Sequence, residues 1–257
     1  LFMIKYLKEI KATLENITTL MADSIDTDRI SLKEKVKDAL VILEKQTLVQ
    51  KSMDTYIFLT NEEQEVEKMI DKIDVDTNDI LRKISEKIFD GLYSEKKYQH
   101  PEFNEYNFFF NQEIDDNPRG NNLHDIGINI VTGNSEYSGN ESLLLMKSSQ
   151  KNCVFIDLGE DNSYSREIEM DLKIEKFLKS GEADSLPQGD VIKLKKSTER
   201  REHSERALRL IEEALKNAKY YINGSRVTIN AKDYKKGIAE ALGKLVNIVF
   251  HKLSYIT

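Results

Sequence analysis

The N-terminal part of the chain combines helical and extended apolar patterns. Apolar side chains three and four residues apart predict an amphipathic helix over residues 1–21, and a second helix capped by Ser31 after the polar segment ADSIDTDR. The segments TLVQK and TYIFLT predict two short strands around SMD. Thr60 then begins a third helix, because Glu63 completes a capping box with it.

The middle of the chain changes from a helical to an alternating pattern. Isoleucines four residues apart predict a helix over residues 74–95. The alternating isoleucines of IGINIVTG predict a half-buried strand, and the runs SLLLMKSS and NCVFIDLG predict two more strands joined by a turn at Gln150. We therefore expect an antiparallel, β-rich sheet over residues 96–160, followed by a helix over residues 164–180 that Gly181 ends.

A long, strongly charged helix follows the linker GEADSLPQGD. Its first half, KKSTERREHSERA, has no apolar stripe, and we therefore expect that it cannot bury a face against its own domain. Charge pairs four residues apart, Glu199 with His203 and Glu202 with Arg206, are available to support it. We expect this stretch either to bridge two subdomains across solvent or to dock another subunit or another part of a longer protein.

The predicted elements make an α+β protein of three parts. Residues 1–73 follow the order helix, helix, two-stranded hairpin, helix, which is typical of a winged-helix-like module. Residues 74–185 form a subdomain of helices and antiparallel sheet. Residues 186–257 contain the long helix, a hairpin around Asn223-Gly224 and a final helix capped by Asp233. Asn-Gly between two short strands strongly favours a hairpin turn.

Composition narrows the class of protein. The 257 residues are 39% hydrophobic and 32% charged, with a net charge of -7, so a globally basic nucleic-acid-binding surface is excluded. No apolar run reaches the roughly 20 residues of a membrane helix, and we expect no signal peptide. Cys153 is the one cysteine and is expected to be a buried, unreactive thiol, which fits a cytoplasmic location. Because the chain opens with LFMIKYL rather than Met, we expect a segment of a longer protein.

Motifs for catalysis are missing from the sequence. No Gly-x-x-x-x-Gly-Lys-Ser/Thr loop occurs, and the glycines of IVTGNSEYSGNES are spaced for a flexible turn with no lysine in the required place. The four histidines lack metal-ligand spacing. Glu113, Asp115 and Asp116 could bind a divalent cation, but acidic turn residues are the commoner explanation. We therefore predict no catalytic or metal-binding residues and no cofactor.

Nucleic-acid binding has one candidate surface, which is the helix before the hairpin of the winged-helix-like module. Its phosphate-binding residues would be Lys33, Lys37, Lys45 and Lys51. Acidic residues are interleaved with these lysines, so an ordinary solvated helix face is the alternative. A clustered lysine face would favour DNA, whereas a mixed face would favour protein contacts.

Several segments in the same order resemble one family. FLTNEEQEVEKMI, KKYQHPEFNEYNFFFNQEIDDNPRG, IGINIVTG and the C-terminal YYINGSRVTINAKDYKKGIAEALGKLVNIVFHKLSYI are similar to the BrxC family of PglY-related P-loop ATPases from BREX bacteriophage-exclusion systems. The resemblance runs from about residue 30 to the C-terminus. It implies a bacterial cytoplasmic protein that acts in phage defence beside a DNA methyltransferase and a phosphatase-like component.

The resemblance also implies an ATPase core, with ATP and Mg²⁺, N-terminal to the residues present here. Because the Walker motifs are absent, we expect a non-catalytic segment that does not hydrolyse ATP alone and that binds duplex DNA or a partner protein. The alternative is a structural platform that assembles the defence complex from other BREX components without contacting DNA.

Overall fold

The computed structural model describes residues 1, 4–5, 9–52, 54–103, 105–231 and 233–252. The chain divides into two compact units. Unit 1 comprises Leu1–Asp74 and Lys173–Lys196, and unit 2 comprises Val75–Leu172 and Ser197–Thr257. Each unit has a core of its own and is described by itself.

Unit 1 begins with a small helical module that carries a two-stranded sheet. Its elements are α1 (Leu14–Leu20), α2 (Arg29–Lys45), β1 (Val49–Ser52), β2 (Thr55–Phe58) and α3 (Asn61–Asp71). The strands β1 and β2 pair antiparallel. The buried side chains of Val36 and Leu40 from α2 pack with Ile17, Val49 and Tyr56, so the inner face of α2 forms this core.

The first helix is shorter than predicted, and the second has a different cap. Thr13 is extended, bridges to Thr55 and caps α1 through its side chain, so the prediction of a helix over residues 1–21 is wrong. Parts of that predicted helix, residues 2–3 and 6–8, lie outside the described residues. Asp28 rather than Ser31 caps α2, because its carboxylate accepts from the first two N–H groups that follow Arg29.

Unit 2 is built on one mixed sheet. The strands are β3 (Lys97–Gln99), β4 (Asn107–Ile114), β5 (Asn117–Pro118), β6 (Ile126–Val131), β7 (Cys153–Asp157), β8 (Lys219–Ile222) and β9 (Ser225–Val227). The sheet order is β3-β4-β6-β7-β8-β9, with β5 beside β4. The central strands β4, β6 and β7 are parallel, whereas the outer strands pair antiparallel.

The prediction of an antiparallel sheet over residues 96–160 is therefore wrong. The run SLLLMKSS is not a strand but belongs to helix α5 (Glu141–Gln150), which Asn140 caps. This helix is the crossover that two neighbouring parallel strands, β6 and β7, require. All six residues of β6 are buried, rather than every second one, because a central parallel strand is covered on both faces of the sheet.

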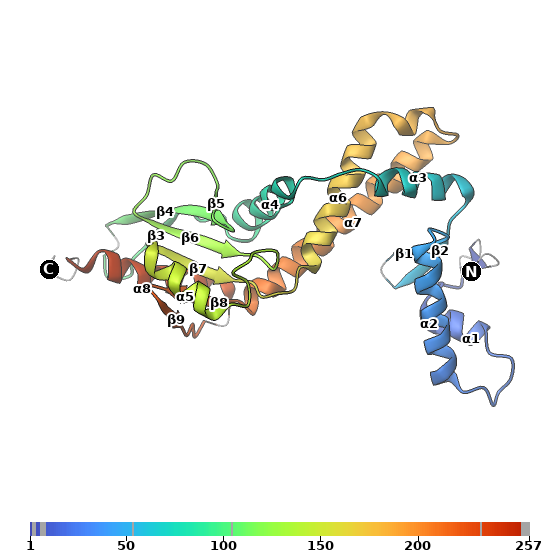
Figure 1. The fold of residues 1–257 in the computed structure, drawn as a ribbon, viewed down its shortest axis with the longest axis horizontal. Helices are drawn as coiled ribbons and strands as arrows, with labels where there is room; N and C mark the ends of the chain where they lie inside the picture. The colour runs from blue at the N-terminus through green and yellow to red at the C-terminus, as the bar shows by residue number, and fades with distance from the viewer. Residues whose placement is uncertain (2–3, 6–8, 53, 104, 232, 253–257) are drawn as a thin grey trace. The chain divides into compact units, whose positions relative to one another are not determined.

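Helices cover both faces of the sheet in unit 2 (Figure 1). On one face, α4 (Thr77–Glu86) and α8 (Tyr234–Val249) pack on the isoleucines of β6 and form the main core. On the other face, α5 contacts β7, β8 and β9 around Leu144 and Phe155. The long helices α6 (Ser163–Ser180) and α7 (Gly189–Lys216) contribute residues to both units.

Two glycine turns define element ends. Gly181 has a φ of 78° directly after α6, which is the left-handed position that commonly terminates a helix. Asn223 and Gly224, with φ angles of 47° and 74°, form the two-residue connection between β8 and β9. Both angles are positive, as a type I′ turn requires. Within the described residues, no helix is long and apolar enough to span a membrane.

Candidate functional site

The four lysines predicted to contact DNA lie on α2 and β1 in unit 1. Lys33 forms an ion pair with Glu15 of α1. Lys37 is exposed on α2, and Lys45 is exposed at its last turn. Lys51, on β1, lies 5.7 Å from the ring centre of Tyr56. The structure therefore spreads these lysines over two elements.

Exposed apolar side chains stand between the charges of the same helix. The exposed fractions are 77% for Ile30, 40% for Val41 and 56% for Ile42. The acidic residues Glu34 and Asp38 are exposed on α2 as well. The outer face of α2 is thus a mixed apolar and charged surface rather than a continuous basic one.

The acidic residues considered as a cation site lie in two separate arrangements. Glu113 on β4 and Asp116 after it form ion pairs with Lys151, and Lys147 also binds Asp116 at 3.1 Å. Asn129 on β6 donates to both carboxylates. Opposite charges therefore already satisfy Glu113 and Asp116. Among the described residues, no three His, Cys, Asp or Glu side chains are grouped to hold a metal ion.

Asp115 instead binds the loop after the neighbouring parallel strand. Its carboxylate accepts from the Thr132 backbone N–H at 2.7 Å and from the Thr132 hydroxyl at 2.6 Å. Burial raises the pKa of Asp115 to about 6, although the two bonds from Thr132 act in the opposite direction. This contact ties the ends of β4 and β6 together at the carboxyl edge of the parallel strands.

The glycine-containing loop between β6 and α5 uses its own polar groups to satisfy its backbone. The Gly133 N–H donates to the Tyr164 hydroxyl at 2.8 Å, and the N–H groups of Ser135 and Ser138 donate to carbonyls within the loop. A phosphate-binding loop needs such N–H groups free and converging on the ligand. In this loop at least these donors, together with that of Thr132, are occupied by acceptors of the protein itself.

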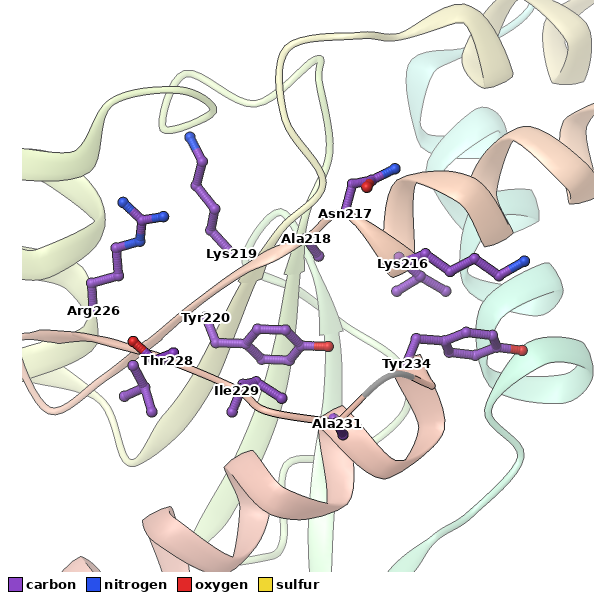
Figure 2. Close-up of a pocket in the computed structure, with 13 residues that line it drawn as sticks. Lys216, Asn217, Ala218, Lys219, Tyr220, Arg226, Thr228, Ile229, Ala231 and Tyr234 are labelled. Atoms are coloured by element: carbon purple, nitrogen blue, oxygen red, sulfur yellow. The ribbon is translucent and has the colours of Figure 1, made fainter.

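A cavity of about 530 Å³ lies in unit 2 between the end of α7, strands β8 and β9 and the start of α8 (Figure 2). Its charged lining residues are Lys216, Lys219 and Arg226. Among the described residues that line it, none is Asp or Glu. Figure 2 shows the ring of Tyr220 reaching into the middle of this space, with Tyr234 at one side.

The side chains of the cavity differ in how far they are already engaged. Lys216 pairs with Glu212 at 2.9 Å, and this bond raises the pKa of the lysine. Arg226 lies 4.0 Å from Glu141, and both side chains are more than half exposed. For Lys219, the described residues offer no ion-pair partner. Tyr220 is only 6% exposed, and burial raises its pKa to about 12, so its hydroxyl stays protonated.

The charged first half of α7 packs on acidic partners instead of projecting freely. In unit 1, Lys196 is buried and pairs with Glu67 of α3. In unit 2, Arg200 binds Asp171 of α6 at 2.8 Å, and this carboxylate is almost fully buried. The expectation that this stretch cannot bury a face within its own domain is therefore wrong, because the buried face is ionic rather than apolar.

The predicted charge pairs along α7 are present, but the distances between their charged atoms are long. His203 Nε2 lies 3.7 Å from Glu199, and Arg206 lies 3.9 Å from Glu202. Both cations make shorter contacts with Glu167 of α6, at 2.7 Å from His203 Nδ1 and 2.9 Å from Arg206. Hydrogen bonds to Glu199 and Glu167 outweigh the effect of burial and raise the pKa of His203.

Comparison with known proteins gives one family. Residues 73–245 match the family model described as "BREX ATP-binding protein BrxC 4th domain with six-stranded beta sheet". No solved structure matches the chain. The matched residues include every strand of the unit 2 sheet and the cavity at the end of α7.

Proposed function

The chain belongs to the BREX BrxC family, through its fourth-domain group, and on this basis we propose that it is a non-catalytic interaction segment of a phage-defence ATPase. Membership gives the chain a role in the BREX phage-defence system. The partner we propose is another BREX protein, bound through the outer face of α2 in unit 1.

The observation that supports this proposal is the composition of the outer face of α2. Its exposed apolar residues, Ile30, Val41 and Ile42, stand among both basic and acidic side chains. Protein interfaces combine an apolar centre with a polar rim, whereas nucleic-acid surfaces are basic throughout. Leu20, Met21 and Ile25, in and after α1, are also exposed and enlarge the apolar surface of the same module.

A winged-helix-like module is the arrangement we propose for residues 1–73. Three features support it: the order of α1, α2, β1 and β2, the antiparallel pairing of the strands, and the bond from the Tyr56 N–H to the Ala12 carbonyl at 2.9 Å. That bond and the bridge from Thr13 to Thr55 add an extended segment beside β2. In such modules the helix before the strands is the contact surface.

The test uses purified proteins encoded in the same BREX gene cluster. Each is immobilised in turn, and binding of the 257-residue chain is measured by biolayer interferometry. Ile30→Glu with Ile42→Glu should weaken the interaction at least about tenfold, because it places charges in the apolar centre. Val191→Glu, at an exposed apolar position of α7, is the matched control and should leave binding unchanged. Failure of every BREX protein to bind, or equal binding by the double variant, would contradict the proposal.

Duplex DNA is the second candidate, supported by Lys33, Lys37, Lys45 and Lys51 on α2 and β1. Such contacts should give weak, sequence-independent binding with a log–log salt slope of about -0.9 for each phosphate neutralised. Fluorescence anisotropy with the wild-type chain and a variant with all four lysines changed to Glu separates the two candidates. Binding that does not depend on salt, or that survives in the variant, excludes these lysines as DNA contacts.

The absence of catalysis is part of the proposal. The loop between β6 and α5 has the position of a phosphate-binding loop, after a parallel strand and before a helix, but lacks its lysine. The N–H groups of Thr132 and Gly133 are engaged by Asp115 and Tyr164, which supports the same conclusion. Titration calorimetry with Mg-ATP should detect no micromolar site, and a measured site would overturn this part.

A further inference from the structure

The turn between β8 and β9 contains the one Asn-Gly dipeptide of the sequence, Asn223-Gly224. We propose that Asn223 is a site of spontaneous deamidation, and that the folded β8–β9 hairpin controls how fast it reacts. Asn223 is exposed at the tip of the hairpin, and Gly224 is half-buried. Because glycine has no Cβ, its backbone nitrogen is the least shielded of any residue type. The dipeptide therefore favours the reaction, whereas the fold opposes it.

The reaction needs only the protein and water. The Gly224 backbone N–H gives its proton to a base in the solvent, and the nitrogen attacks the side-chain carbonyl carbon, Cγ, of Asn223. The side-chain nitrogen takes up a proton and leaves as ammonia, so that a five-membered succinimide ring is formed. Water then opens the ring at either of its two carbonyls. The product has Asp or isoaspartate at position 223 and one additional negative charge.

The folded hairpin holds the attacking nitrogen in another direction. The Gly224 N–H donates to the Ser148 hydroxyl of α5 at 3.1 Å, and so it is directed at α5 rather than at the preceding side chain. Ser148 is only 1% exposed and is itself fixed by donation to the Leu145 carbonyl. The two turn residues have φ angles of 47° and 74° and lie between the paired residues Ile222 and Ser225. Ring closure therefore requires the turn to open.

Opening of the hairpin is consequently the step that permits the reaction. Strand β9 has three residues and lies at the end of the sheet order, beside β8. Short segments at the edge of a structure open locally at a lower free energy than the whole domain unfolds. When opening and closing are fast, the rate of a slow reaction follows the population of the open form. The deamidation rate of Asn223 thus measures local opening of this hairpin.

The two products should affect the hairpin differently. Asp at position 223 is tolerated, because Asp-Gly also favours a type I′ turn. Isoaspartate adds one carbon to the main chain between residues 223 and 224. A two-residue turn with this longer main chain cannot keep Ile222 opposite Ser225. The isoaspartyl form should therefore lose the pairing of β9 with β8.

The experiment incubates the full chain in mildly alkaline water enriched in the heavy oxygen isotope, which marks each succinimide that water opens. Peptide mass spectrometry then measures the label at Asn223 over time. The folded chain should be labelled at least about tenfold more slowly than the chain unfolded in urea, because only the open fraction reacts. In urea, Asn223 should react faster than Asn121, which is followed by Asn122 rather than by glycine.

Replacing Ser148 by Ala tests the hydrogen bond that holds the nitrogen. Loss of this acceptor should raise the rate in the folded chain roughly two- to tenfold and leave the rate in urea unchanged. Ser149→Ala is the matched control, because Ser149 is exposed on the same helix and donates to the Met146 carbonyl. This control should react at the wild-type rate. The urea midpoint of each variant shows whether its stability as a whole has changed.

Three results would overturn the proposal. Equal labelling of folded and unfolded chains would contradict control by the hairpin. Labelling of Asn223 in urea no faster than that of Asn121 would contradict the choice of site. Equal rates for the folded Ser148→Ala variant and the wild type would contradict the role of the hydrogen bond. These outcomes are independent of partner binding by α2 in unit 1.

Discussion

Replacing Glu167 by Ala tests whether an ionic interface holds α6 against α7 in unit 2. The carboxylate accepts from His203 Nδ1 at 2.7 Å and from Arg206 Nε at 2.9 Å. Its side chain and those of its partners are between 14% and 25% exposed, so water screens the pairs only in part. Arg206 Nη2 lies only 2.8 Å from the same His203 nitrogen, and removing the carboxylate leaves these two side chains with the longer contacts to Glu199, at 3.7 Å, and Glu202, at 3.9 Å.

The expected loss of stability follows from these contacts. Hydrogen bonds to charged groups contribute about 1.5–3 kcal/mol each when they are well shielded. Because both bonds are partly solvated and share one carboxylate, we expect about 2–3 kcal/mol in total rather than their full sum. For a unit of this size, that is a decrease in melting temperature of roughly 5–10 °C. Glu167→Gln, which keeps the volume and one acceptor, should lose less.

The assay is urea unfolding followed by circular dichroism, at several pH values. Glu205→Ala is the matched control on α7, because Glu205 is exposed and 3.9 Å from an exposed Arg201. This control should change stability by less than about 0.5 kcal/mol. Equal stability of the Glu167→Ala and Glu205→Ala variants would refute the ionic interface.

The pH dependence adds an independent readout. The folded-state pKa of His203 is raised, because hydrogen bonds to Glu199 and Glu167 outweigh burial. Its stabilisation is therefore complete below the ordinary histidine pKa of about 6.5 and is lost as pH rises through the folded value. The Glu167→Ala variant should show a smaller loss of stability over this interval. A slope as steep as that of the wild type would place the titrating group elsewhere.

Three further predictions concern the sheet of unit 2. Asp115→Asn should flatten the pH profile: the raised pKa of about 6 stabilises the wild type below pH 3.8, and about 2–3 kcal/mol is lost as pH rises through 6, measurable by urea unfolding. Cys153, whose pKa burial raises to about 12, should resist iodoacetamide at pH 8 in the native state and react once unfolded, as read by mass spectrometry. Gly133→Ala should lower the melting temperature, because its Cβ would lie 2.8 Å from the Asp161 carbonyl oxygen, whereas Gly91→Ala has open space.

Predictions that rest on a few neighbouring residues agree with the structure. The capping box of Thr60 and Glu63 is present, with both reciprocal bonds, because its geometry depends on four consecutive residues. Gly181 ends α6 in the left-handed conformation for an equally local reason. Asp233 caps α8 by accepting from the Lys235 N–H. In each case the side chain satisfies a backbone group within its own turn.

Predictions that depend on distant partners are less successful. SLLLMKSS is apolar at four consecutive positions, a pattern that fits a short buried strand as well as a helix, and only its place between two parallel strands selects α5. The pairing of β4 with β6 was missed because the peptide between them contains no crossover helix, and a short connection favours an antiparallel neighbour. The acidic partners of α7 on α6, Asp171 and Glu167, lie 29 and 36 residues from Arg200 and His203, beyond the range of any helical spacing rule.

The cavity illustrates why a site can be invisible in the sequence. Its lining comes from the end of α7, two short strands and the first turn of α8, so no motif contains its residues together. The net charge of -7 argues against a globally basic surface but says nothing about one cavity. The local charge depends on where the acidic side chains lie and on which cations they pair with.

In this protein several carboxylates are buried in ion pairs. Glu67 and Asp171 are buried against cations of α7, and Glu113 is buried against Lys151. The cations in the first half of α7 pair with carboxylates of neighbouring elements. The helix ends at the cavity, where Lys216 is one of the lining residues. Excess negative charge and an acid-free cavity are therefore compatible.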